Sequence, residues 1–120
     1  MGVVEDKLEI SDLIARYPDV VDSRDFDRLD ELFTADARID FSAFGGPTDS
    51  LLGIKKFLRD SLGFFKRSQH MMGLPNITLD GDRARARTSC SNPMVFDNSD
   101  GTTTVWLIGL WYDDEFERTS

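Results

Sequence analysis

The chain has 120 residues, enough for one domain, and 40% of them are hydrophobic, so a core can form without cross-links. Its 22 acidic and 14 basic side chains give a formal net charge of −8, which repels polyanions and argues against nucleic acid as a partner. A single cysteine, a first segment without a signal-peptide pattern and the absence of any apolar run near ~20 residues predict a cytoplasmic protein that does not enter membranes.

Three helices are predicted in the first half of the chain. The first has an apolar stripe at steps of three and four residues, but Pro18 lies within it and should kink that helix or end it early. Asp25 is placed to cap a short second helix, and the third begins near Asp49 or Ser50. The side chains expected to be buried are Ile10, Leu13, Ile14, Tyr17, Val20 and Val21 in the first, Phe26, Leu29, Leu32 and Phe33 in the second, and Leu51, Ile54, Leu58, Leu62 and Phe65 in the third.

The remaining segments are typical of β-strands. They cover residues 37–41, 68–79, 83–96 and 102–118. Pro75 must lie at an edge or a bulge, the Asp80-Gly81 pair predicts a hairpin, and Pro93 is expected at a second bulge. Helices followed by long antiparallel strands predict an α+β fold, and the lack of repeats and linkers predicts one domain over residues 1–120.

Three arginines alternate with small residues in one predicted strand. Arg83, Arg85 and Arg87 therefore share one face of the sheet. That face is either a solvated or subunit-facing surface or, alternatively, a phosphate site.

His70 is the only histidine, and histidine is the side chain suited to carry a proton near neutral pH. A lone histidine in a strand can equally be structural. Asp22 follows the apolar stripe of the first helix by one residue, which would carry its carboxylate toward the interior, where it needs a hydrogen-bond partner. If Asp22 accepts a bond from His70, it fixes the imidazole tautomer and leaves the other nitrogen free for a substrate proton. The alternative is that Asp22 only caps the following turn.

Tyr17 lies on the same stripe, so its hydroxyl could point into a pocket and donate to a carbonyl or a developing oxyanion. The alternative is a core aromatic ring with its hydroxyl at the rim. Cys90 is interpreted as a buried thiol. The sequence has no metal-ligand spacing, glycine-rich phosphate loop or nucleophile elbow, so neither a metal nor a cofactor is predicted.

Five stretches, in this order, resemble the SnoaL-like branch of the nuclear transport factor 2 superfamily. They are residues 14–17, 22–29, 32–37, 80–86 and 110–114. The resemblance implies a cone-shaped, curved antiparallel sheet packed by three N-terminal helices around an apolar pocket, as in a cystatin-like roll. An exposed sheet face makes a homo-dimer or another homo-oligomer the expected state. Such domains usually continue with a further strand, so we expect a truncated form or a shorter sheet.

Within that superfamily, residues 22–29 and 67–70 are similar to the segments that bear the aspartate–histidine pair of scytalone dehydratases, and Asp22 and His70 match that pair. Four positions at which that family has polar catalytic groups are apolar here, namely Val21, Phe41, Met94 and Ile108. We expect these four and Trp106 to line a substrate pocket, and scytalone itself is a poor substrate guess. Tyr17 is similar to the oxyanion-hole tyrosine of ketosteroid isomerases, but their catalytic aspartate would fall at Phe41.

Two functions follow from this pattern. The first is a cofactor-independent dehydratase, isomerase or cyclase for a hydrophobic oxygenated compound, with His70 as the base, Asp22 orienting it and Tyr17 polarising a carbonyl. The second is a non-catalytic small-molecule-binding or interaction module. A carboxylate bonded to one imidazole nitrogen, with the other nitrogen facing an open cavity, would favour the enzyme. A filled cavity would favour the binding module.

Overall fold

The computed structural model describes residues 2–119, and their first element is the long helix α1 (Val3–Asp22). Pro18 lies inside α1, yet the helix continues to Asp22, so of the two expected outcomes, a kink or an early end, the early end is wrong. The reason is tertiary packing. Val20 and Val21, which follow the proline, are 1% and 0% exposed, and their burial offsets the backbone hydrogen bond that Pro18 cannot make.

The second and third helices are the 3₁₀ helix η1 (Phe26–Glu31) and the α-helix α2 (Leu51–Leu62). Asp25 is at the N-cap of η1, although its side chain makes no capping bond there. Ser50 caps α2, because its Oγ accepts a hydrogen bond from the Gly53 N–H at 3.5 Å. The helices enclose the main core, which consists of Val20, Val21, Phe26, Leu29, Leu51, Ile54, Leu58, Leu62 and Met94.

The segment that joins η1 to α2 in the chain forms a two-stranded sheet. It pairs β1 (Arg38–Asp40) with β2 (Thr48–Ser50) in antiparallel fashion, and the short helix η2 (Ser42–Phe44) joins them. The strand predicted over residues 37–41 is therefore confirmed.

The main sheet is built around the 15-residue strand β6 (Arg83–Asp97). One edge of β6 pairs along its whole length with β7 (Thr103–Glu117), and the other pairs with β3 (Arg67–Ser68), β4 (Met71–Met72) and β5 (Asn76–Asp80). The predicted strand over residues 68–79 is thus three short strands.

The break at Pro75 is a bulge, as expected, because residues 73–75 lie opposite only residues 88 and 89 of β6. The expected bulge at Pro93 is wrong, since β6 and β7 keep one register throughout. The Pro93 carbonyl accepts a bond from the Gln69 N–H at 3.1 Å, so the missing donor of the proline faces the gap between β3 and β4. Pro93 therefore interrupts the neighbouring strand instead of its own.

The hairpin between β5 and β6 forms one residue later than expected. Asp80 and Arg83 still pair, and the two turn residues are Gly81 and Asp82. Gly81 has a φ of +60°, whereas Asp82 has no positive φ, a pattern typical of a type II′ turn.

The arginines of β6 do share an exposed face of the sheet. Arg83 and Arg87 pair with acidic residues of β7, at 3.6 Å from Glu117 and 3.6 Å from Asp113. The guanidinium of Arg87 also lies over the Trp111 ring, 4.5 Å from its centroid. This charge pairing supports the interpretation of a solvated or subunit-facing surface.

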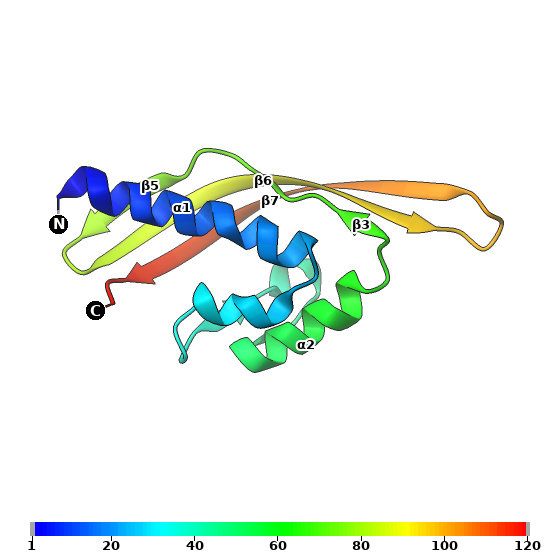
Figure 1. Cartoon of the computed structure of the whole chain (residues 1–120), viewed down its shortest axis with the longest axis horizontal. Coiled ribbons are helices and arrows are strands. Elements are labelled where there is room, and N and C mark those ends of the chain that lie inside the picture. The colour runs from blue at the N-terminus through cyan, green and yellow to red at the C-terminus, as the bar shows by residue number, and fades with distance from the viewer. Residues whose placement is uncertain (1, 120) are drawn as a thin grey trace.

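In Figure 1, α1 lies lengthwise along one face of the main sheet, and α2 lies under the C-terminal part of α1. The tip of the β6–β7 hairpin projects beyond the helices, which gives the molecule extents of 55 × 27 × 23 Å. None of the helices within residues 2–119 combines the length and the apolar character needed to cross a membrane.

Candidate active site

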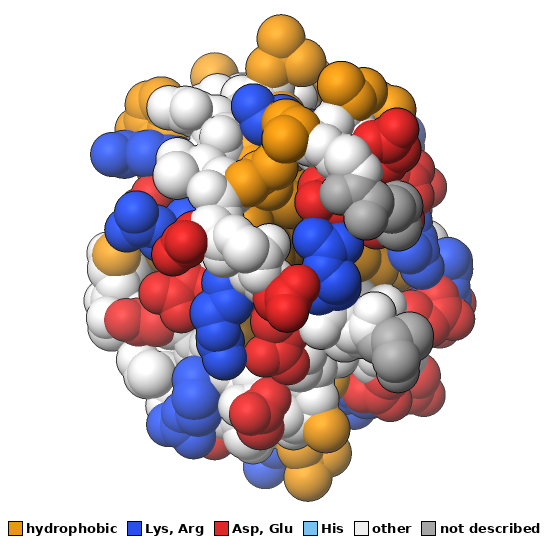
Figure 2. All heavy atoms as spheres, turned by 90° about the vertical axis from the view of Figure 1, so that its left-hand side faces the viewer, with side chains coloured by type: hydrophobic (Ala, Val, Ile, Leu, Met, Phe, Trp, Pro, Cys, Tyr) orange, Lys and Arg blue, Asp and Glu red, His pale blue; other side chains and the backbone are white. Residues whose placement is uncertain are grey.

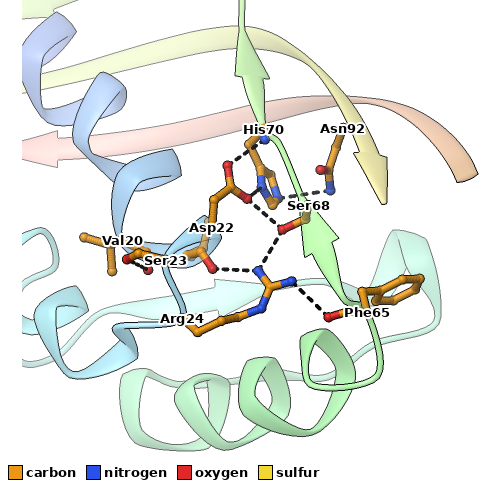
Figure 3. Close-up of polar contacts among 9 residues, drawn as sticks. Val20, Asp22, Ser23, Arg24, Phe65, Ser68, His70 and Asn92 are labelled. Carbon is orange, nitrogen blue, oxygen red and sulfur yellow. Dashed lines mark hydrogen bonds and ion pairs between the residues drawn. The ribbon is translucent and has the colours of Figure 1, made fainter. Parts of the chain in front are cut away.

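The structure brings Asp22 and His70 together (Figure 3). Asp22 is the last residue of α1, and His70 lies in the gap between β3 and β4. The His70 ring Nδ1 is 2.7 Å from Asp22 Oδ1, and the His70 backbone N–H donates to Asp22 Oδ2 at 2.8 Å. The Gln69 N–H donates to the Pro93 carbonyl of β6, so the N–H of the next residue, His70, points away from β6. It is therefore available to donate to Asp22. With side chains 7% and 20% exposed, histidine and aspartate form a nearly buried pair.

Two further side chains hold the Asp22 carboxylate in place. Ser68 lies two residues before His70, on the same side of the chain, and its Oγ donates to Asp22 Oδ1 at 2.7 Å. The same Oγ accepts a bond from Arg24 Nη1 at 2.7 Å, and that nitrogen also donates to the Val21 carbonyl at 2.9 Å. Arg24 has a left-handed φ of 64°, which is unusual for an arginine, and burial lowers its pKa. The network therefore joins the end of α1 to the edge of the sheet.

The second ring nitrogen of His70 is also bonded. Nε2 lies 3.2 Å from Nδ2 of Asn92, a 5% exposed residue of β6. A carboxylate at Nδ1 and an amide N–H at Nε2 are both satisfied by a neutral imidazole with its proton on Nδ1. The Oδ1 atom of Asn92 is buried without a partner among the described residues. The nitrogen expected to face a cavity therefore faces an amide.

Two tyrosines lie next to the histidine. The Tyr17 ring meets His70 edge-on, with centroids 6.1 Å apart, and meets Tyr112 of β7 at 5.6 Å. Burial raises the pKa of both hydroxyls well above the usual value. Both hydroxyls therefore remain protonated donors at neutral pH. Cys90 is buried, as expected, and desolvation raises its pKa to about 11, so its thiol is unreactive.

Asp114 is an acidic group farther along the inner face of β7. Burial, helped by the neighbouring charge of Asp113, raises its pKa to about 6. Its side chain is partly buried.

The five residues expected to line a pocket fall into two groups. Val21 and Met94 are buried members of the main core, and Phe41 and Ile108 pack against that core. Trp106 is 49% exposed and packs edge-on against Phe65 and Phe96, with centroid distances of 5.7 and 5.1 Å.

Sequence reasoning missed Ser68, Arg24, Asn92 and Tyr112. Strand alternation could have identified Ser68, which shares a face with His70. The pairing of Asn92 with the histidine depends on the register of two distant segments, which no local pattern shows. Within residues 2–119, no three His, Cys, Asp or Glu side chains are grouped so that they could hold a metal ion.

Residues 2–120 match the family model of the SnoaL-like domain. The chain belongs to this family. Uncharacterized protein Rv2910c of Mycobacterium tuberculosis is 44% identical over 116 residues, which are 97% of this chain and 78% of that protein. The crystal structure of Kfla4162 from Kribbella flavida is 31% identical, with a TM-score of 0.87, over 99% of this chain and 84% of that one.

A structure from Novosphingobium aromaticivorans, described as a candidate scytalone dehydratase, is 18% identical, with a TM-score of 0.78, over 92% of this chain and 72% of that one. At this identity the likeness shows the fold alone. The α+β prediction and the resemblance to the SnoaL-like branch of the nuclear transport factor 2 superfamily are both confirmed.

Proposed function

We propose that this protein is a cofactor-independent acid–base catalyst of the dehydratase or isomerase type, acting on a hydrophobic ring compound that carries a carbonyl group. The observation that carries the proposal is the 2.7 Å contact between Asp22 and the only histidine in the chain. A carboxylate at Nδ1 fixes the tautomer that has its lone pair on Nε2, which is the form that a general base needs.

In the proposed reaction, Nε2 of His70 removes a proton alpha to the substrate carbonyl, and the electron pair moves to the carbonyl oxygen as an enolate. For this step the Asn92 amide must first turn over, because its N–H occupies the lone pair of Nε2 in the resting protein. Its Oδ1, which has no partner among the described residues, can accept the new Nε2–H. The proton returns to another carbon in an isomerase, or leaves with a hydroxyl group as water in a dehydratase.

The tyrosine pair supplies donors for the enolate oxygen. Tyr17 lies beside the imidazole, and the raised pKa of its hydroxyl keeps the proton in place to stabilise a developing negative charge. General acid–base help of this kind contributes about 10²–10⁴-fold, and positioning in the interior must supply the rest.

The experiment is proton exchange in D₂O. A panel of cyclic ketones, β-hydroxyketones and 1,3-diketones is incubated with the protein, and loss of the alpha proton is followed by NMR. We expect at least one compound to exchange faster with the wild type, and His70→Gln to reduce that rate by about 10²–10⁴-fold. Equal rates for wild type and His70→Gln on every compound would contradict the proposal.

The second candidate function is a non-catalytic binding or interaction module. The observation that favours it is the occupation of Nε2 by Asn92, together with apolar residues at four positions that are polar in scytalone dehydratases. A binder predicts that a compound found by equilibrium dialysis binds wild type and His70→Gln alike and exchanges no proton.

We further propose a homo-dimer formed through the outer face of the main sheet. Met71, Val105, Leu107 and Trp111 expose 46%, 60%, 73% and 58% of their surface on that face. The arginine row of β6 lies beside an acidic row of β7, so two copies related by a twofold axis can pair opposite charges. Sedimentation analysis should give a dimer, and Leu107→Asp should shift it toward monomer; a monomeric wild type at high concentration would contradict this.

A further inference from the structure

A second candidate site lies at the opposite end of α1 from Asp22. There the first half of α1, the β5–β6 turn and the end of β7 surround a hollow of about 420 Å³. Figure 2 shows apolar side chains at the bottom of this hollow and acidic and basic side chains around its rim. The apolar side chains that line it are Ile10, Leu13, Leu79, Ala84 and Phe116.

Among residues 2–119, no helix or strand fills the space beside this part of the apolar stripe. Ile10 and Leu13 belong to the same stripe as Val20 and Val21, yet they remain only partly buried. The buried β6 residues at this end of the sheet are small, beginning with Ala84, and do not fill the space under the helix. A ligand that covers this apolar surface removes it from water, which favours binding. The volume of about 420 Å³ lies within the range of small-molecule pockets.

The rim of the hollow carries an excess of negative charge. Four carboxylates and two guanidinium groups line it, from Asp6, Glu9, Asp82, Glu117, Arg83 and Arg118. Arg118 is already bonded on both sides, to Asp6 through two contacts of 2.9 Å and to Asp82 through one of 2.9 Å. Glu9 has no ion-pair partner among the described residues and stands at the rim of an apolar hollow. An anion would meet this excess charge, whereas a cation would balance it.

We propose that this hollow binds a small ring compound that carries a positive charge, at a site separate from Asp22 and His70. Glu9 precedes Asp22 by 13 residues of α1, which places them roughly 20 Å apart along the helix. The apolar rings would lie on Leu13 and Phe116, and the charged group would lie near Glu9. The inference does not depend on the acid–base function, since it uses none of its residues.

The test uses three probes of one shape. These are 2-naphthylmethylamine, which is a cation at pH 7, the neutral 2-naphthylmethanol and the anion 2-naphthoate. Each is titrated into the ¹⁵N-labelled chain, and binding is followed by NMR. We expect the amine to bind about fivefold more tightly than the alcohol and the anion to bind most weakly, with shifts at Gly81, Ala84 and Phe116 and not at His70.

Variants test separately how the charge of Glu9 and the space in the hollow contribute to binding. Glu9→Gln should weaken the amine about three- to fivefold and leave the alcohol unchanged, whereas Asp12→Asn, an exposed carboxylate on α1 outside the hollow, should change neither. Ala84→Leu should fill the floor and weaken all three probes, and the Glu9 comparison decides the matter if Ala84→Leu does not fold. No saturable binding of the amine, equal or tighter binding of the anion, or shifts centred on His70 would each overturn the proposal.

Discussion

The two halves of α1 have the same apolar periodicity and face the same sheet, but they end in different surroundings. In the second half, Val20 and Val21 are 1% and 0% exposed in a packed core that η1 and α2 complete. In the first half, Ile10 and Leu13 remain partly buried above a hollow. The comparison teaches that periodicity predicts which face of a helix points inward, whereas the covering elements decide whether the space beneath is filled.

Truncations of matched isoleucines should give the largest difference between the two ends. Ile54, 2% exposed, contributes to the packed core, and Ile54→Ala should lower the free energy of unfolding by about 4 kcal/mol. Ile10→Ala should lower it by only about 1 kcal/mol, because the side chain is already partly hydrated and leaves no closed cavity. Urea denaturation measures both, and equal losses would mean that the hollow is closed in solution.

The polar network of the packed end gives the next effect. Asp22→Ala leaves the His70 backbone N–H, the ring and the Ser68 hydroxyl without their acceptor, which should cost about 3 kcal/mol of stability. Asp25→Ala is the control, since that exposed carboxylate makes no capping bond, and it should change stability by less than about 0.5 kcal/mol. Similar losses for the two variants would show that the network does not hold α1 to the sheet.

Asp114 gives an effect of opposite sign. Its pKa of about 6 in the folded protein lies above the value near 3.9 expected for the unfolded chain, so the folded state binds the proton more tightly. The stability that this contributes is complete below about pH 4 and is lost as the pH rises through 6. Asp114→Asn should therefore remove that pH dependence and raise stability at pH 7 by about 2 kcal/mol. Urea titrations at pH 4.5 and pH 7 check this, and an unchanged pH profile would place Asp114 in water.

The smallest effect belongs to the hollow end. Arg118 joins α1 to the β5–β6 turn through exposed contacts with Asp6 and Asp82, and salt screens exposed ion pairs. Arg118→Gln should lower the melting temperature slightly at low salt and less at 1 M salt. A decrease in melting temperature that does not depend on salt would mean that packing of the Arg118 side chain, and not its charge, joins α1 to the β5–β6 turn.

Local patterns in the sequence were enough for the helices and most strands. The stripes of α1 and α2 identify the core, and the start of α2 was correctly predicted near Asp49 or Ser50. The continuation of α1 past Pro18 was not predictable, because it depends on what covers Val20 and Val21. The gap between β3 and β4 has its cause in Pro93 of the neighbouring strand, which a search within residues 68–79 could not detect.

The residues of the candidate site were also only partly predictable from the sequence. The apolar stripe and the family resemblance together pointed to Asp22 and His70, and the structure places their side chains in contact. The amide of Asn92 lies beside Nε2 only because of the register between β6 and the interrupted strand opposite it. The hollow could not be predicted, since its volume depends on how α1, the β5–β6 turn and the end of β7 pack together within residues 2–119.

The ¹⁵N chemical shifts of the imidazole nitrogens test the central claim most directly. The chain contains one histidine, so labelled histidine gives its two nitrogen signals without further assignment. With Asp22 as the acceptor at Nδ1, the neutral ring should show a protonated Nδ1 and an unprotonated Nε2, and Asp22→Ala should abolish this preference. A wild-type ring with its proton on Nε2 would contradict the account, because the nitrogen proposed as the base would then have no lone pair.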